Sequence, residues 1–340
     1  MLLGKSSLEI DDYDTLVIAY RYIKNVVIPS FIKHIGPYAF EEWENIDKFE
    51  IPEDSELLTI GEGAFCGSSI SYLKIPPSLT MIDEAAFERC GLYELEIPPN
   101  SNLQTIKQFA FADSYIQSLT IPAKLVEPEN FWFSNVINLV TIKVDPINPR
   151  YKEHGDFIIG KSSINNDDFD SIIFYNRNVS NVEIPNFIRV IDINAFQYCS
   201  VSEVEVEENS KLEQIKNEAF TGSLIKSITI PSSVKIIHEA AFSLCRDLRR
   251  FDFQENSKLE EIKFEAFFQS AIVSFIIPAS VKNIDCNSFS QCNELVIVEF
   301  EETENQLDIY NPFKGSSHAL IMIPVKLLYL LDLLTYKNFR

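Results

Sequence analysis

The sequence predicts a β-rich solenoid, a coil in which short repeats stack on one another. Phenylalanine, in Ala-Phe pairs or near variants, recurs every 22 to 25 residues over most of the chain. An apolar-x-Ile-Pro step recurs beside it, and a large part of the chain is duplicated. A period in the twenties indicates a unit that buries its apolar edge only by stacking on its neighbours.

The recurring phenylalanines are expected to form an apolar spine along the centre of the coil. They are Phe40, Phe65, Phe87, Phe111, Phe133, Phe196, Phe220, Phe242, Phe267, Phe289 and Phe313, and Phe157 bridges the one long gap. Each such ring buries about 150–250 Å². Stacking of these rings would therefore supply much of the burial in every repeat.

Each repeat also contains a strand of alternating apolar and polar residues. Residues 73–76 (LKIP) and 119–122 (LTIP) show the pattern, and residues 204–206 (VEV) keep the strand without the proline. Alternation predicts one buried face. Proline cannot donate a hydrogen bond to a neighbouring strand, so it marks where each strand leaves the sheet. These strands predict a parallel sheet on one side of the coil.

The other side of the coil is expected to hold short return strands and turns. Residues 79–82 (LTMI) and 234–237 (VKII) are candidate return strands, and residues 83–87 (DEAAF) predict a brief helical turn. The longer repeats insert an Asn-Ser-x-Leu or Asp-Ser-x-Leu corner, at residues 54–57, 100–103, 209–212 and 256–259. Asn, Asp and Ser bond their own backbone in turns, which suits a wider corner.

A longer period lies over the short one. Residues 4–40 align without a gap on residues 160–196, an offset of 156. We therefore expect one continuous solenoid over residues 1–340, with a first copy in 1–156, a second copy in 157–312, and a partial third copy with a C-terminal cap in 313–340. Residues 325–334 are interpreted as a short capping helix. Docking to a partner, a missing continuation or a membrane surface are the alternatives for this segment.

Composition excludes some function classes. Lys and Arg number 29 against 50 Asp and Glu, a net charge of −21, which repels nucleic acids and anionic lipids. Pro324, Lys326 and Asp332 interrupt the apolar C-terminal run before it reaches the length of a transmembrane span. The sequence starts in mid-repeat without a signal-peptide pattern. The six cysteines mostly share one slot of the repeat, which predicts buried free thiols rather than disulfides or a metal site.

One motif matches a phosphate-binding loop. Residues 155–162 (GDFIIGKS) satisfy G-x-x-x-x-G-K-[ST], but the repeat frame places Phe157, Ile158 and Ile159 in the core. The acidic segment that follows is a poor helix former, whereas the mechanism needs a helix N-terminus. The four histidines fall in different turns, so they predict no triad or metal cluster. We therefore expect no enzymatic activity, no cofactor and no bound metal.

The repeat pattern L-x-x-I-x-I-P-x-x-(V/L)-x-x-I-x-x-x-A-F-x-x-C resembles the BspA-like leucine-rich repeats, the LRR_5 type. Residues 144–159 also look like the extended module of that family. The resemblance covers the chain to about residue 325. It implies a curved leucine-rich-repeat solenoid with its parallel sheet on the concave face, and it implies adhesion to host proteins or other cells.

The outward-pointing strand positions are the candidate binding residues, because solenoids bind through such ladders. These candidates are Glu50, Tyr72, Lys74, Tyr93, Glu96, Thr120, Lys143, Glu183, Glu205, Thr229, Asp252, Ile276, Ile297 and Glu299. Tyr72 and Tyr93 are candidate aromatic anchors near Lys74 and Glu96. Val273, Ile276, Val296 and Ile297 form an apolar end that is either a partner site or covered by the chain's own terminus. The alternative for the polar positions is that they merely present a solvated face.

The sequence therefore favours a non-enzymatic binding scaffold whose partner is a protein, with no nucleic acid and no membrane span. Its main hypothesis is adhesion or protein recognition through the concave strand face, at the cell surface or after secretion by a non-classical route. The second hypothesis is an intracellular, cytoplasmic interaction scaffold, which the missing export signal and the unpaired cysteines favour.

Overall fold

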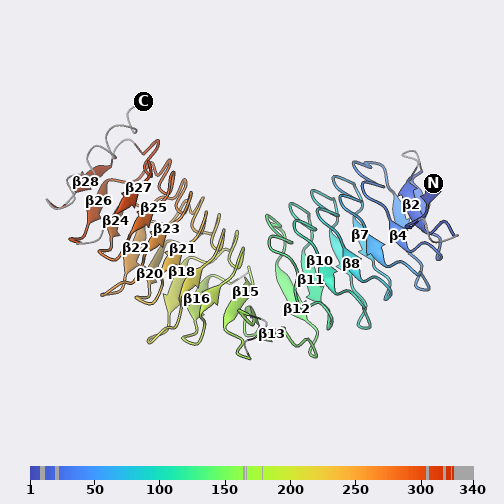
Figure 1. The fold of residues 1–340 in the computed structure, drawn as a ribbon, viewed down its shortest axis with the longest axis horizontal. Coiled ribbons are helices and arrows are strands. Elements are labelled where there is room, and N and C mark those ends of the chain that lie inside the picture. Colours follow the sequence, from blue (N-terminus) through green and yellow to red (C-terminus); the bar gives the residue numbers. More distant parts are fainter. Residues whose placement is uncertain are drawn as a thin grey trace. The chain divides into compact units, whose positions relative to one another are not determined.

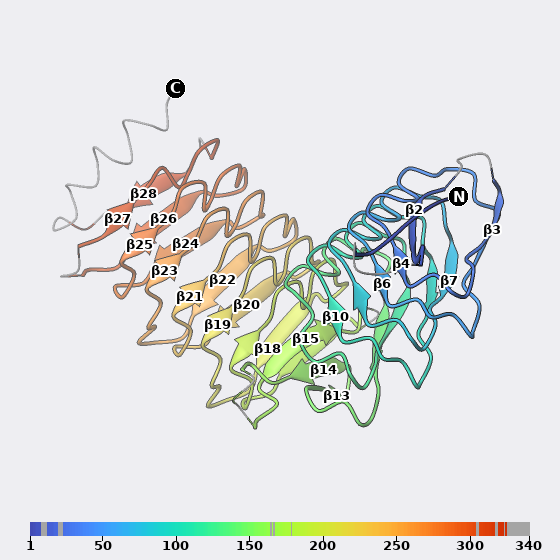
Figure 2. The same cartoon turned by 45° about the vertical axis from the view of Figure 1, so that its right-hand side comes forward.

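The computed structural model of the chain describes residues 1–7, 12–19, 23–163, 165, 167–177, 179–303, 306–316, 319–322 and 324. It contains two compact units, Met1–His154 and Gly155–Arg340, and each is a coil of short strands (Figures 1 and 2). All regular elements in these described ranges are β-strands. The units divide just before the expected copy boundary at 156/157, so each holds one copy of the duplicated sequence. One continuous solenoid over the whole chain stays a prediction.

The first unit has strands on two sides of its coil. Its strand face consists of β3 (Asn25–Val27), β5 (Lys48–Glu50), β7 (Tyr72–Lys74), β9 (Glu94–Glu96), β11 (Ser118–Ile121) and β12 (Thr141–Val144). Its return face consists of β1 (Leu2–Gly4), β2 (Thr15–Ile18), β4 (His34–Ile35), β6 (Thr59–Ile60), β8 (Met81–Ile82) and β10 (Thr105–Ile106). The unit ends with β13 (Tyr151–His154). The return strands form one sheet in the order β1-β2-β4-β6-β8-β10.

The second unit repeats this plan. Its strand face consists of β16 (Asn181–Ile184), β18 (Glu203–Val206), β20 (Ser227–Ile230), β22 (Arg250–Phe253), β24 (Ser274–Ile277), β26 (Ile297–Phe300) and β28 (Leu320–Met322). Its return face consists of β14 (Phe157–Gly160), β15 (Ser171–Tyr175), β17 (Val190–Ile191), β19 (Gln214–Ile215), β21 (Ile236–Ile237), β23 (Glu261–Ile262), β25 (Asn283–Ile284) and β27 (Asp308–Ile309). Figure 2 shows the strands of this unit following one another along the coil, from green β14 to red β28.

The return strands confirm the second strand predicted for each repeat. The two-residue return strands each end in a buried isoleucine, as in Ile60, Ile82 and Ile106. These isoleucines pair in register from coil to coil. The ladder of buried isoleucines therefore joins neighbouring coils on the return face without interruption.

The predicted phenylalanine spine is present within each unit. In the first unit the Phe40 and Phe65 rings stack with centroids 5.0 Å apart and an interplanar angle of 1°. In the second unit Phe220 lies between Phe196, at 4.7 Å, and Phe242, at 5.0 Å. These rings are almost inaccessible to solvent. The stacking confirms the central role that the sequence period assigned to them.

One ring of the spine belongs to a tyrosine, which the phenylalanine period did not predict. The ring of Tyr175 lies between Phe157, at 5.1 Å, and Phe196, at 5.0 Å. Its hydroxyl donates to the carbonyl of Asn181 at 2.9 Å. A buried tyrosine needs a partner for its hydroxyl, and the start of β16 provides one. The long gap in the phenylalanine period is therefore filled by an equivalent ring.

The prediction of a brief helical turn beside each ring is wrong. At residues 83–90 the chain forms successive β-turns, in which Ala86 N donates to Asp83 O and Glu88 N donates to Ala85 O. The alternate N–H groups of Ala85 and Phe87 donate to carbonyls of the next coil. Ala85 has φ 52°, in the left-handed region, and this prevents an α-helix. The turn is thus shaped by bonding between coils, which local propensity does not include.

Each unit begins with an antiparallel hairpin that the sequence did not predict. Strands β1 and β2 pair antiparallel, and β14 and β15 pair in the same way with a register shift at the equivalent residue. Asp14 accepts hydrogen bonds from the backbone N–H and the hydroxyl of Ser6, at 2.8 and 2.7 Å. Asp170 accepts the same two bonds from Ser162, at 2.9 and 3.0 Å. The duplicated G-K-S-S segments therefore have a structural role.

The predicted C-terminal capping helix, residues 325–334, lies outside the described residues. Just before these residues, β28 pairs in parallel with β26. Phe313, in the partial third copy, stacks on Phe289 at 5.3 Å and continues the spine. The ring stack thus extends to Phe313.

Candidate functional site

The candidate residues lie on the strand face of their units, at positions that point away from the core. Leu73, Leu95 and Val204 are buried, whereas Glu96 and Glu205 beside them are exposed. The same alternation applies to most of the predicted candidates. Thr120, Lys74, Asp252 and Ile297 are half-buried, and the other predicted candidates are exposed.

The sheet of the strand face is interrupted or weakened at the longer coils. Strands joined by a shorter coil pair in register, as β7, which begins at Tyr72, pairs with β9, which begins at Glu94. Strands joined by a longer coil do not: β5 and β7, β9 and β11, and β22 and β24 fall in different sheets. Strands β18 and β20, also joined by a longer coil, share only the pair Glu203 and Ser227. The strand face therefore opens at regular places.

The extra residues of each longer coil form the wide corner predicted from the sequence. In the coil of β5, the hydroxyl oxygen of Ser55 accepts a hydrogen bond from Leu57 N at 3.2 Å. The same bond joins Ser101 to Leu103, Ser210 to Leu212 and Ser257 to Leu259. Asn209 and Asn256 adopt positive φ in these corners, a conformation that asparagine tolerates. The corner widens the coil on the side of the strand face.

A proline follows the second strand at each gap. In the paired strands β20 and β22, Gln254 N donates to Ile230 O at 2.9 Å. Pro278 occupies the equivalent place after β24, and it has no N–H with which to reach the end of β22. Proline alone does not open the sheet, because β5 and β9 precede prolines and still pair in register with their other neighbours. Each gap therefore combines a longer coil with a proline after the second strand.

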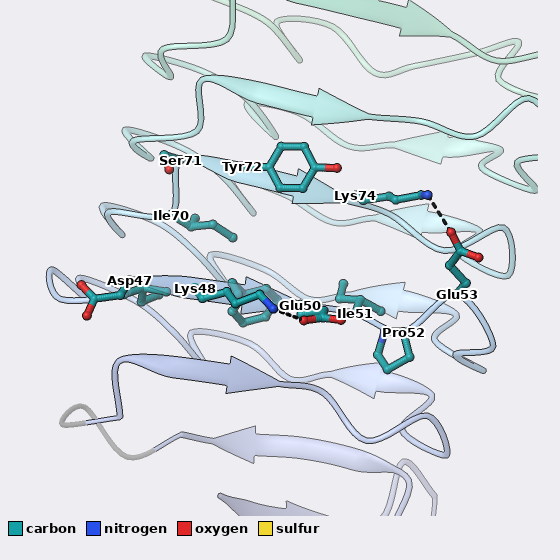
Figure 3. A pocket seen from close by; sticks show the side chains of 12 residues that line it. Asp47, Lys48, Glu50, Ile51, Pro52, Glu53, Ile70, Ser71, Tyr72 and Lys74 are labelled. Carbon is teal, nitrogen blue, oxygen red and sulfur yellow. Dashed lines mark hydrogen bonds and ion pairs between the residues drawn. The ribbon is translucent and has the colours of Figure 1, made fainter.

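The first gap forms a groove of about 430 Å³ between β5 and β7, here called groove 1 (Figure 3). The candidates Glu50, Tyr72 and Lys74 line it, together with Asp47 and Glu53, which sequence reasoning missed. Other lining residues are Ile46, Lys48, Phe49, Ile51, Pro52, Ile70 and Ser71. Figure 3 shows Tyr72 and Lys74 on one strand and Glu50 on the other.

Both lysines that line groove 1 are paired with glutamates. Lys48 lies 2.6 Å from Glu50, and Lys74 lies 2.8 Å from Glu53 and 3.3 Å from Glu96. The Tyr72 hydroxyl donates to Glu96 at 2.8 Å, and this bond raises the pKa of Tyr72 and lowers the pKa of Glu96. Hydrogen bonds to Glu53 and Glu96 raise the pKa of Lys74. This network links three neighbouring coils and holds the predicted aromatic anchor in place.

The second predicted anchor, Tyr93, lies apart from this network. Its side chain is 52% exposed just before β9, and it does not line groove 1. The structure therefore brings Tyr72, Lys74 and Glu96 together, as the sequence suggested, but leaves Tyr93 on the open strand face beyond them.

The gap between β22 and β24 forms groove 2, of about 590 Å³. Asp252 and Ile276 are the predicted candidates that line it. Sequence reasoning missed the others, which are Phe251, Phe253, Gln254, Glu255, Asn256, Ser257, Ser274, Pro278, Ala279, Ser280 and Glu301. A longer interval between two strands, followed by proline, is the signal that could have located this groove.

The predicted apolar end continues onto β28. Ile276 and Val296 are about half exposed, and Leu320 and Met322 add to them with exposed fractions of 61% and 40%. Ile297 pairs with Leu320 in register, whereas Glu299 pairs with Ile276 on one side and Met322 on the other.

The remaining candidates lie on paired parallel strands within each unit. Thr120 pairs with Lys143, Glu183 with Glu205, and Thr229 with Asp252, all between parallel strands. Ile276 pairs with Glu299 in the same way. The two carboxylates of Glu183 and Glu205 lie side by side, so this part of the strand face is strongly acidic.

The motif that matches a phosphate-binding loop is part of the coil. Phe157, Ile158 and Ile159 lie buried in β14, and Ser162 is bonded to Asp170. Cys90, Cys199, Cys245 and Cys292 are buried free thiols, and burial raises their pKa values to about 11 or 12. In the described part of the chain, no group of His, Cys, Asp or Glu side chains converges as a metal site.

Stacked coils, parallel ladders and a ring spine define the class of this protein as a leucine-rich-repeat solenoid. The family model described as the BspA type leucine rich repeat region matches residues 18–140, 58–166 and 167–303, in six copies. The chain therefore belongs to the BspA-type leucine-rich-repeat family, as its sequence pattern suggested. A comparison with curated proteins found no match.

Solved structures share the fold. A leucine-rich repeat protein from Eubacterium ventriosum is similar with a TM-score of 0.74 and 17% identity, over 89% of this chain and 85% of that chain. The pneumococcal vaccine antigen PcpA is similar with a TM-score of 0.66 and 18% identity, over 88% and 70%. A leucine rich cell surface protein from Faecalibacterium prausnitzii is similar with a TM-score of 0.62 and 19% identity, over 94% and 85%. At these identities the likeness shows the fold alone.

No helix long and apolar enough to cross a bilayer occurs in the described residues.

Proposed function

We propose that this protein is a non-enzymatic scaffold of the cell surface that recognises protein partners, in adhesion, through its strand face. The observation that carries the proposal is that grooves 1 and 2 both open on this face, at the gaps left by the longer coils. Clefts lined by a few polar groups around apolar side chains are typical of binding sites. Two of the similar solved structures are named as a vaccine antigen and a cell surface protein, which supports the proposed location.

A matched pair of tyrosines tests the role of the strand face. Tyr72, on the strand face, and Tyr38, among the turns of the return face, are similarly exposed, and each donates its hydroxyl to a glutamate. The Tyr38 slot in the turns accepts alanine, because Ala85 and Ala240 occupy equivalent positions with positive φ. Both tyrosine-to-alanine variants should therefore fold.

The experiment compares the proteins captured by the wild type, Tyr72→Ala, Ile276→Asp and Tyr38→Ala from solubilised host-cell surfaces. We expect the strand-face variants to lose partners that Tyr38→Ala retains. Retention of every partner by both strand-face variants would refute the assignment of the binding face. Labelling of intact cells with a membrane-impermeant reagent tests the location, and protection of the protein would favour the intracellular scaffold instead.

A further inference from the structure

The charges of the two grooves differ, although both arise from the same kind of gap. In groove 1 both lysines are paired with glutamates, so its charges are compensated internally. Groove 2 is lined by Asp252, Glu255 and Glu301, and no Lys or Arg is among the described residues that line it. Groove 2 is therefore an acidic groove in a protein that is already acidic.

The carboxylates of groove 2 differ in their partners. Asp252 forms an ion pair with Arg250, which lies on the same strand outside the groove lining. One oxygen of Glu301 accepts the backbone N–H of Ala279 at 2.9 Å. Within the described residues, neither Glu301 nor Glu255 forms an ion pair. Two carboxylates at the groove are thus available to an added cation.

Apolar side chains lie between these carboxylates. Phe253 contacts Phe251 and Phe275 edge to face, with centroids 5.4 and 5.6 Å apart, and these contacts hold its ring in place. Ile276, about half exposed, and Pro278 complete the apolar part of the lining. The site therefore combines a preformed apolar surface with carboxylates around it.

We propose that groove 2 binds a lysine- or arginine-bearing peptide segment of a partner protein. Such side chains have an aliphatic stem, which suits Phe253 and Ile276, and a cationic head, which suits Glu255 and Glu301. A cation over the Phe253 ring gains further attraction from the ring face. The volume of about 590 Å³ is that of a small-ligand site, so it accommodates individual side chains rather than a folded domain. This inference rests on the proposed function and specifies the partner chemistry of one groove.

The test measures binding of a fluorescent peptide of alternating lysine and alanine to the full chain by anisotropy. The combined change Glu255→Gln and Glu301→Gln should weaken binding about tenfold, since exposed ion pairs are each worth up to about fivefold. The amide of glutamine can still accept the Ala279 N–H. The control changes Glu208→Gln and Glu239→Gln remove the same charge from residues outside the groove lining, and should weaken binding much less.

A gain of binding provides the sharper test. Arg250→Gln removes the ion-pair partner of Asp252 and should tighten peptide binding several-fold. Arg246→Gln removes the same charge from a residue bonded to Gln269, which does not line the groove, and should change binding little. Equal effects of groove and control variants would overturn the proposal, because binding would then depend on net charge alone. Equal binding of a glutamate–alanine peptide would also overturn it. Because the capture experiment with Tyr72→Ala probes groove 1, failure here leaves the proposed function intact.

Discussion

At the scale of single residues, the spine rings hold neighbouring coils together. Phe220 is fully buried and lies between two parallel rings, so its removal leaves a cavity that neither coil can fill. We expect Phe220→Ala to lower the free energy of unfolding by about 3–5 kcal/mol. Urea unfolding followed by circular dichroism measures the change. Phe31→Ala is the control, because its ring is half exposed; similar losses in the two variants would argue against the spine.

A second residue-scale effect concerns the half-buried His238. Burial, and then the nearby charges of Lys216 and Lys263, lower the pKa of His238 below its ordinary value of 6.5. Its Nε2 atom is buried and has no hydrogen-bond partner among the described residues. The folded state therefore binds a proton at His238 less readily than the unfolded state does.

This lowered pKa predicts a loss of stability in mild acid. Stability from the neutral imidazole is complete above pH 6.5, the unfolded value, and falls as the pH drops towards the lower folded pKa. We expect His238→Gln to lose less stability than the wild type between about pH 7 and pH 5, a range set around the ordinary histidine pKa. Urea midpoints measured across this range provide the test. Parallel curves for the two proteins would contradict it.

At the scale of elements, serine hydroxyls of one coil form hydrogen bonds with backbone carbonyls in the corner of the preceding coil. The Ser233 hydroxyl lies 3.3 Å from Ser210 O and donates to Leu212 O at 2.7 Å. Ser78 makes the same two bonds in the first unit. We expect Ser233→Ala to cost about 1 kcal/mol of stability. The neighbouring change Ser232→Ala is the control in urea unfolding, and an equal cost there would show that the corner bonds add nothing.

Paired strands also place like charges side by side. Glu183 of β16 and Glu205 of β18 are in register and exposed. Directly opposed like charges destabilise a sheet, and salt screens them. We therefore expect Glu205→Gln to raise the urea midpoint slightly at low salt and to lose this advantage at about 1 M salt, where screening acts within about 3 Å. A gain that persists at high salt would point to a cause other than repulsion.

At the scale of the whole molecule, each unit has its own spine of stacked rings. The core of the second unit runs from Phe157 to Phe313 as one buried cluster. Because each coil is stabilised by its neighbours, a unit with a complete stack should fold alone. We expect Gly155–Arg340, expressed separately, to give a β-rich circular dichroism spectrum and cooperative urea unfolding. An unfolded fragment would show that the second unit depends on the first.

Much of this architecture could be predicted because a repeat encodes burial locally. The period of Phe65 and Phe87, the alternation around Leu73 and the corner at Ser55 each depend on neighbours a few positions away, or one repeat away, and all are present as predicted. The family followed from the same pattern. The acidic composition likewise predicted a negatively charged surface.

Tertiary structure decided what depends on bonding between coils. The turns at Ala85 are not helical because alternate N–H groups donate to the next coil. Tyr175 joined the spine because the stack requires a ring there, whatever its type. The grooves arise where a longer coil meets a proline, so Glu255, Glu301 and the missed lining residues became neighbours only in the folded coil. By itself the sequence determined the repeat and the strand positions that point outward, since these follow from periodic burial. The three-dimensional stack decided where gaps open in the strand face, since hydrogen bonds between coils are not local.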